Sequence, residues 1–479
     1  MNMTEGKKKK TLWNFIDNLE GDKVVWMIVL LLILFSIVAI FSSTSQMTYH
    51  GGSRINIVGG QMLTAAAGLV VILLCYAIPK IGVFRYFSQL GYGVSLVLLI
   101  PTCIAQLTLG EKEIMNLGLF TVQKVNNACR AITIHGIDIQ VLEVAKLAMV
   151  MYLAWAVNAL RNDDFSIANR LAEKNPFWGK TWTKKIAYVY IPLCSVIALI
   201  YPNSNTSALF TAAIMAATIV VGGIKWKEIL IPGGLVIAVI VVVGMTFNIG
   251  RFGTFKNRFG MIERNMSVMV ESSPGSKEFR KALEAIKQPV SAKIAIKEGK
   301  IFGKGPGKST QRYVTPIMYE DYMFSLIVEE YGLIGAIIVI ALYISLLARG
   351  IIIVRNCNNH FAKTAVAGLV LLISCQGMMH IAINCDIMPH TGQTLPMISY
   401  GRSSFLMFSL AFGIILSISK MAKRKIDKET MEAEPLVKRE AEVRDEVRSG
   451  MDDLDLMESG MPVHENDIPD YGLDDHNNE

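Results

Sequence analysis

Ten apolar runs, each close to the length of a transmembrane helix, constrain this chain more than any other feature of its sequence. Crossing roughly 30 Å of hydrocarbon takes about 20 helical residues. The runs lie at residues 24–42, 58–78, 88–107, 138–159, 186–202, 206–224, 229–248, 326–348, 364–385 and 399–419. The sequence therefore predicts an all-α polytopic membrane protein with about ten transmembrane helices. Only 18% of its residues are charged, which excludes an ordinary soluble enzyme.

Lysine and arginine in the short loops predict the orientation of these spans. The loops that follow the even-numbered runs are basic, whereas the short loops at 44–57 and 386–398 contain only Arg54. Both termini are therefore expected in the cytoplasm. The first run is too long for a cleaved signal peptide, and no small-residue cleavage site follows it.

Five regions follow from this pattern. They are a basic cytoplasmic N-terminus (1–23), spans 1–7 (24–248), a large extracytoplasmic loop (249–325), spans 8–10 (326–425) and an acidic cytoplasmic tail (426–479). The loop has fourteen Lys and Arg against seven acidic residues, and the tail has five against eighteen. Few large apolar residues occur after residue 450, so we expect the end of the tail to be disordered. Seven cysteines without CxxC spacing favour small buried side chains over disulfides or a metal site.

The extracytoplasmic loop contains a glycine-rich stretch, Gly299 to Ser309, that invites comparison with a phosphate-binding loop. Its spacing is one residue too short for that motif, and no predicted strand precedes it. A flexible basic loop can still offer backbone N–H groups, Lys304 and Lys308 to a pyrophosphate. General attraction of the loop to anionic lipid headgroups is the alternative.

Two pairs of carboxylates stand where the loop re-enters the membrane. Glu320 and Asp321 are candidates for chemistry, or else first-turn residues that complement the helix dipole. Glu329 and Glu330 fall inside the predicted span, where a charge is costly. We expect one of them to be protonated or bonded to a neighbouring span.

Two further clusters carry polar residues into apolar surroundings. Gln140, Glu143 and Lys146 recur every three residues on one helix face, close after Asn126 to Arg130. The alternative for Glu143 and Lys146 is a self-satisfied ion pair at the outer interface. Met388 to Ser404, with its prolines, glycines and hydroxyls, predicts a broken start to the last span, which protein or a cavity must cover. His380 and His390 are too isolated for a metal site, so core or interfacial roles are expected.

Four stretches together resemble the SEDS family, the shape, elongation, division and sporulation proteins typified by FtsW and RodA. The most specific is Pro389 to Ser404, which resembles the family's Pro-x-Thr-Gly-x-x-Leu-Pro-x-x-Ser-x-Gly-Gly-Ser. The others are Asn126 to Arg130 with Ile132, Ile139 to Leu147, and Tyr319 to Ser325 with Glu329 to Gly332. The resemblance covers nearly all of 22–420. This chain departs from the family pattern at Asn127, Ala131, Val141, Arg402 and Pro202 to Thr206.

The resemblance implies a peptidoglycan glycosyltransferase that polymerises lipid II on the outer face of the cytoplasmic membrane, with inversion at the sugar. Asp321 matches the family's essential aspartate and would be the base. The candidate substrate-binding residues are Arg130, Glu143, Lys146, Arg258, Lys304, Lys308, Ser399, Arg402 and Ser403. A divalent cation, Mg²⁺ or Mn²⁺, is an open expectation, and no organic cofactor is expected.

The expected partners are a class B penicillin-binding transpeptidase and other division proteins, and no nucleic acid. The basic N-terminal extension and the long tail favour a role at the division septum over elongation. Two other functions stay open. A lipid II flippase could use the intramembrane Glu143, Lys146, Glu329 and Glu330, and a non-catalytic scaffold could recruit the transpeptidase. Retention of Asp321 favours the enzyme.

Overall fold

The computed structural model describes residues 20–44, 54–108, 114–116, 120–125, 128–134, 137–229, 233–234, 260–315, 318–389 and 391–424. Most of the predicted seventh span, the basic N-terminus and the acidic tail therefore lie outside the described residues. So do Arg258, Asn126, Asn127 and His390.

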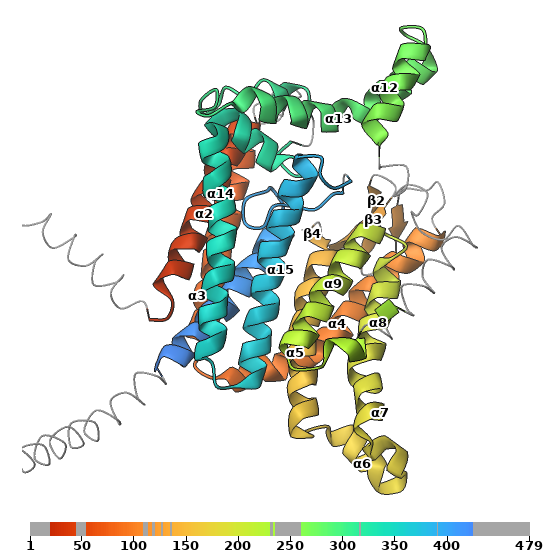
Figure 1. Cartoon of the computed structure of the whole chain (residues 1–479), viewed down its shortest axis with the longest axis vertical. Coiled ribbons are helices and arrows are strands. Elements are labelled where there is room, and N and C mark those ends of the chain that lie inside the picture. Colours follow the sequence, from red (N-terminus) through yellow and green to blue (C-terminus); the bar gives the residue numbers. More distant parts are fainter. Residues whose placement is uncertain are drawn as a thin grey trace, which may run out of the picture. The chain divides into compact units, whose positions relative to one another are not determined.

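Apolar helices dominate the described part of the chain (Figure 1). Eight of them are long and apolar enough to cross a membrane, and α9 (Asn205–Val221) is a shorter apolar helix. The eight are α2 (Lys23–Ser43), α3 (Arg54–Ala77), α4 (Ile81–Thr108), α5 (Val141–Asn162), the span Thr181–Ile200, α14 (Met323–Asn356), α15 (His360–Asn384) and a last helix, Arg402–Arg424. The span Thr181–Ile200 consists of α7 (Thr181–Lys185), the π-helical turn η3 (Ile186–Tyr190) and α8 (Ile191–Ile200). These helices confirm the polytopic helical fold, and nine of the ten predicted spans match a helix to within eight residues at either end.

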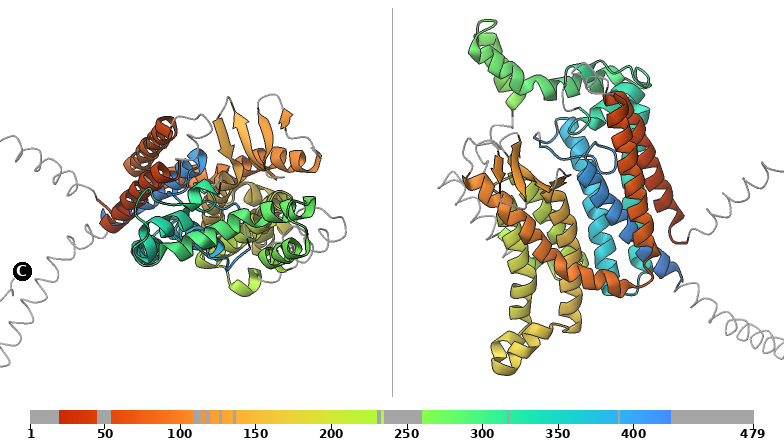
Figure 2. Two further views of the ribbon diagram at one scale, coloured as in Figure 1. Left: turned by 90° about the horizontal axis from the view of Figure 1, so that it is seen from above. Right: turned by 180° about the vertical axis from the view of Figure 1, so that it is seen from behind.

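A small sheet, which the sequence analysis did not predict, connects α4 to α5 (Figure 2). Its antiparallel strands follow chain order: β1 (Ile114–Asn116), β2 (Thr121–Val125), β3 (Ala128–Ile134) and β4 (Ile137–Gln140). Val122 pairs with Ile132, which pairs with Ile139. Val122 and Ile132 are buried in the same apolar cluster as residues of α4 and α5. The sheet therefore covers the end of the bundle where α5 begins.

The long loop before α14 lies at the same end of the bundle as the sheet (Figure 1). We call this the loop end. The loop contains α12 (Met261–Glu271), α13 (Lys277–Gly299) and the short η4 (Gln311–Tyr313). An ion pair between Lys293 of α13 and Asp386 fastens α13 over the end of α15. At the opposite end lie α6 (Ser166–Lys174) and η2 (Pro176–Gly179), which connect α5 to the next span.

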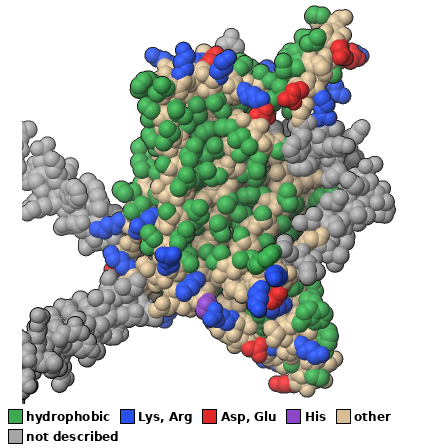
Figure 3. Space-filling model, viewed as in Figure 1, with side chains coloured by type: hydrophobic (Ala, Val, Ile, Leu, Met, Phe, Trp, Pro, Cys, Tyr) green, Lys and Arg blue, Asp and Glu red, His purple; other side chains and the backbone are tan. Residues whose placement is uncertain are grey.

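Helix α5 is the most enclosed of the spans and packs against α4, α9 and α15. Helices α3 and α4 instead expose large apolar side chains, among them Leu63, Leu74, Phe87 and Val97. In the face shown in Figure 3, a band of apolar side chains lies between two zones of charged side chains. An apolar band bounded by charge is the surface that a protein presents to a bilayer.

Candidate active site

A five-residue turn, Met318–Tyr322, holds Asp321 directly before α14 at the loop end. Hydrogen bonds fix three successive carbonyl oxygens of this turn. The Tyr400 N–H donates to Tyr319 (2.9 Å), the Ser399 hydroxyl to Glu320 (2.8 Å) and the Asn384 amide to Asp321 (3.2 Å). All three donors belong to α15 or to the segment that precedes the last helix. The main chain at Asp321 is thus held by a separate part of the fold.

The structure corrects one alternative for the two acids of this turn. Helix α14 begins at Met323, and no acidic residue lies in its first turn. Glu320 and Asp321 precede the helix, and the three bonded carbonyls keep them out of it. Their role as first-turn residues that complement the helix dipole is therefore wrong.

Arg130, on β3, lies next to Asp321. A Cβ atom added to Gly392 would lie 2.5 Å from Arg130 Nη1 and 3.6 Å from Asp321 Oδ1. Burial lowers the pKa of the Arg130 guanidinium, and the charge of Asp321 opposes that shift. Among the described residues, Arg130 Nε has no hydrogen-bond partner although it is buried. The sheet thus places the Arg130 guanidinium beside the candidate base, and the missing side chain of Gly392 leaves room for it.

Glu320 is the second carboxylate of the turn. Its burial and the negative charge of Asp321 raise the pKa of Glu320 to about 7. The same surroundings, burial first and then Glu320, raise the pKa of the neighbouring Tyr319 to about 12. Glu320 therefore loses its proton at a higher pH than an ordinary glutamate does.

Lys146 forms the centre of a second cluster, inside the bundle. Its ammonium group is 1% exposed and donates to Glu143 (2.8 Å) and Gln376 (2.6 Å), with Gln393 at 3.4 Å. The predicted Glu143–Lys146 pair is confirmed. The pair lies in the first two turns of α5, at the loop end, and α15 and the Gln393 segment cover it.

A chain of hydrogen bonds connects this cluster to the Asp321 turn. Gln393 O accepts from the ring Nδ1 of His380 (2.7 Å), and His380 O accepts from the amide of Asn384 (2.9 Å), which also binds Asp321 O. His380 therefore has the core role that its isolation indicated. Sequence reasoning missed Gln376, Asn384 and Gln393. The available signal was a lone amide inside or beside an apolar run, where a polar group must find a partner.

Ser399 and Ser403 hold main chain in place. Besides binding Glu320 O, Ser399 accepts from Leu395 N (3.0 Å), and Ser403 accepts from Gln140 N at the end of β4 (3.0 Å). Arg402 is exposed at the start of the last helix, and a Cβ atom at Gly60 of α3 would lie 3.4 Å from its Nη2. No described contact joins Arg402 to Asp321.

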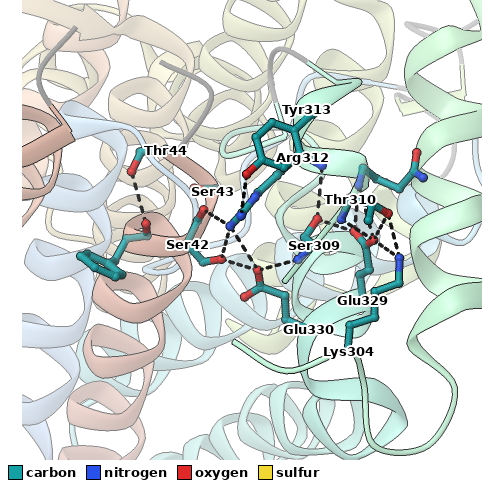
Figure 4. Close-up of polar contacts among 12 residues, drawn as sticks. Ser42, Ser43, Thr44, Lys304, Ser309, Thr310, Arg312, Tyr313, Glu329 and Glu330 are labelled. Atoms are coloured by element: carbon teal, nitrogen blue, oxygen red, sulfur yellow. Dashed lines mark hydrogen bonds and ion pairs between the residues drawn. The ribbon is translucent and has the colours of Figure 1, made fainter. Parts of the chain in front are cut away.

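The loop lysines Lys304 and Lys308 occupy different surroundings, and Figure 4 draws those of Lys304. Lys304 pairs with Glu298 and with Glu329 (2.7 Å), and Lys308 is exposed. Burial disfavours the charged ammonium of Lys304, yet its hydrogen bonds to Glu298 and Glu329 raise its pKa above the ordinary value. Glu330 accepts from the hydroxyl of Ser42 on α2, so the expected bond to a neighbouring span is confirmed.

The described residues contain no group of three or more His, Cys, Asp or Glu side chains that could hold a metal ion. Glu320 and Asp321 are two neighbouring oxygen donors. Mg²⁺ or Mn²⁺ bound there would have to complete its shell with phosphate oxygens and water, as such ions do at phosphate-transfer sites.

Residues 22–424 match a family model described as cell cycle protein, FTSW_RODA_SPOVE. This chain belongs to that family. Among its relatives, the peptidoglycan glycosyltransferase MrdB of Escherichia coli K12 is 25% identical over 426 residues, which are 87% of this chain and 97% of MrdB. A probable peptidoglycan glycosyltransferase FtsW of Caulobacter vibrioides is 27% identical over 311 residues, which are 65% of this chain and 70% of that protein.

Solved structures support the same fold. The Thermus thermophilus rod shape determining protein RodA superposes with a TM-score of 0.54 at 18% identity, over 84% of this family member and 98% of that chain. A chain from work on "Structural coordination of polymerization and crosslinking by a peptidoglycan synthase complex" gives a TM-score of 0.57 at 18% identity, over 84% and 98%.

The family motifs of this FtsW/RodA-type chain converge in space. Arg130 comes from the first, Glu143 and Lys146 from the second, Asp321 from the third, and Gly392 with Ser399 from the fourth. The structure joins them through the approach of Arg130 and Asp321 to Gly392 and through the Lys146–Gln393–His380–Asn384 chain. Segments far apart in the sequence therefore form one site at the loop end.

Proposed function

We infer that this chain is a peptidoglycan glycosyltransferase that polymerises lipid II, a disaccharide carried on undecaprenyl pyrophosphate. The relatives named as peptidoglycan glycosyltransferases, of the MrdB and FtsW types, support the activity. The observation that carries the assignment of the site is Asp321, fixed by its main chain beside Arg130 at the loop end. A carboxylate base next to a half-buried cation suits transfer of a sugar from a diphosphate.

The reaction needs one base and neutralisation of the leaving group. The 4-hydroxyl oxygen of the acceptor sugar attacks the anomeric carbon of the donor from the face opposite the pyrophosphate. The new C–O bond forms as the bond to the pyrophosphate oxygen breaks, and the pyrophosphate departs with the electron pair. Asp321 takes the hydroxyl proton and later releases it to water. Arg130 lies where it would stabilise the developing negative charge.

The loop end is the extracytoplasmic side in this proposal. The basic residues after the even-numbered spans support cytoplasmic termini. We further propose that the chain acts in the cytoplasmic membrane at the division septum beside a class B penicillin-binding transpeptidase. The similar chain from work on a peptidoglycan synthase complex supports the existence of such a partner. Mg²⁺ or Mn²⁺ at Glu320 and Asp321 is also part of the proposal.

The test is glycan polymerisation by the purified full chain with lipid II in detergent. Asp321→Asn should lower the rate at least about 10²-fold, the lower end of what a positioned base contributes. Asp321→Glu should also be impaired, because the extra methylene moves the carboxylate by about an ångström. The matched control is Asp386→Asn, an exposed acid at the same end of the bundle that should keep the parental rate.

The same assay separates the alternatives. Glu320→Gln tests which of the two neighbouring acids is the base, since loss of activity there with full activity in Asp321→Asn would exchange their roles. A flippase or a scaffold makes no glycan in detergent. Parental rates in both acid variants would leave no carboxylate base in the turn and would contradict the proposed mechanism.

A further inference from the structure

Glu329 is a buried carboxylate at the base of the segment that carries Asp321, and Figure 4 draws its contacts. Glu329 is fully buried on α14. Its Oε1 accepts from the Thr310 N–H (2.9 Å) and the Thr310 hydroxyl (2.9 Å), and its Oε2 accepts from the Ser309 hydroxyl. Thr310 and Glu329 are 19 positions apart in the sequence, and Asp321 lies between them. These bonds turn residues 310–329 into a closed loop.

Charge strengthens this closure. Lys304 donates to Glu329 at 2.7 Å, so the carboxylate has an ammonium, two hydroxyls and a backbone N–H as donors. Hydrogen bonds to an ionised group are roughly twice as strong as neutral ones. Lys304 also pairs with Glu298, whose side chain is 42% exposed. Two carboxylates therefore share this lysine, and only the buried one closes the loop.

Backbone hydrogen bonds between the glycine-rich stretch and α14 also hold the base of the loop. Gly332 has a φ of +67° and interrupts α14, so the helix does not supply every bond there itself. The preceding loop does so instead, with Lys304 N bound to Glu329 O and Gly305 N bound to Glu330 O, both at 2.9 Å. A Cβ atom at Gly303 would lie 2.2 Å from Glu330 O, a contact that no larger residue could make. The glycine-rich stretch is thus packed against the start of α14.

A second contact holds the same loop to the first span. Arg312 Nη1 donates to Ser42 O of α2 (3.0 Å) and lies 4.0 Å from Glu330, which itself accepts from the Ser42 hydroxyl. Residues 304–312 are therefore fixed on both α14 and α2. The base of the loop is rigid, while the turn at its far side carries Asp321.

We propose that Glu329 is a positioning residue, which sets the place of Asp321 by closing the base of the 310–329 loop. The proposal rests on the proposed function, in which Asp321 is the base. A base must be held within about 0.5 Å of its productive position, and a misplacement of about 1 Å can lower a rate about 10²-fold. Glu329 contacts no reacting atom in this account.

The experiment measures kcat and KM of the purified full chain with lipid II in detergent. Glu329→Gln keeps an acceptor oxygen but loses the charge, and should lower kcat about 10-fold or more with KM changed less than about twofold. Thr310→Val, at an exposed position, should lower kcat about threefold and guards against a folding defect in Glu329→Gln. The matched control, Glu298→Gln, removes the other partner of Lys304 and should keep the parental kcat.

Closing the loop chemically gives a readout that loss of folding would not produce. In a Cys385→Ser background, Thr310→Cys with Glu329→Cys should be slow, and a short bifunctional thiol crosslinker should restore kcat. Parental kcat in Glu329→Gln and Thr310→Val, or a crosslinked protein as slow as the open one, would overturn the positioning role. Asp321→Asn distinguishes this proposal from the proposed function. If Asp321→Asn is inactive while Glu329→Gln keeps the parental rate, only the positioning role of Glu329 is refuted.

Discussion

Arg130 and Asp321 come from different halves of the chain and approach the same point, the space that a Cβ atom on Gly392 would fill. The guanidinium is carried by a strand of the small sheet and the carboxylate by the turn before α14. The buried Nε of Arg130 has no hydrogen-bond partner in the described part of the chain, so it can donate to a further acceptor.

Replacing Arg130 by lysine should slow glycosyl transfer, even though the substitution keeps the positive charge. Lysine offers a point charge on a flexible stem in place of the planar fork, so contact with both Asp321 and a phosphate would be lost. We expect kcat/KM for lipid II polymerisation to fall about 10-fold to 10²-fold. The control is Arg264→Lys on α12, where the side chain bonds to its own helix. Equal values for the two variants would remove Arg130 from the site.

The raised pKa of Glu320, about 7 against an ordinary 4.5, makes stability depend on pH. The folded protein holds this proton more tightly than the unfolded chain, so the stabilisation is complete below about pH 4.5 and is lost as pH rises through 7. Glu320→Gln cannot ionise. Its melting temperature in detergent should therefore exceed the parental value more at pH 8 than at pH 5. A difference that does not change with pH would contradict the raised pKa.

The Glu143–Lys146 pair should behave as one unit. Each group is buried, so removing one leaves the other without its counter-charge, which typically destabilises a protein by about 3–5 kcal/mol. Glu143→Gln and Lys146→Met should each lower the melting temperature in detergent, and the double variant should be more stable than either single variant. Additive losses in a double-mutant cycle would show that the two charges act separately.

A substitution of Arg402 should show whether its side chain contacts the substrate or only reaches the membrane interface. It is exposed at the start of the last helix, where the family pattern has glycine. If it binds pyrophosphate, Arg402→Lys should weaken lipid II binding by about 10-fold, because a bidentate fork becomes a point charge. Titration of lipid II against the purified protein measures this. An unchanged affinity leaves only the interfacial position.

The spans could be predicted from the sequence because their signal is collective. About twenty apolar residues in succession leave few alternatives in a membrane. The sheet could not, because β1 has three residues and β4 has four, too few for an alternating pattern to be recognised. Its function in bringing Arg130 to Asp321 depends on pairings between strands, which one segment does not reveal.

The candidate site shows the same contrast. Asp321 stands out in the sequence because it is an acid at a membrane boundary. Lys304 stands out in the sequence for its charge. In the structure it forms ion pairs with Glu298 and Glu329, because the fully buried Glu329 carboxylate requires a cation nearby. Asn384 carries no charge and lies inside an apolar run. Its amide nevertheless bonds to Asp321 O and His380 O, because the fold brings three segments together there.

The bond between Ser42 and Glu330 also bears on how the protein is made. The two residues are 288 positions apart, so the first span enters the membrane long before its partner exists. At about 5–20 residues per second, a ribosome needs about 15 to 60 s to reach Glu330. During that interval α2 must remain in the bilayer without this bond. The loop that orders the site can therefore lock onto it only late in synthesis.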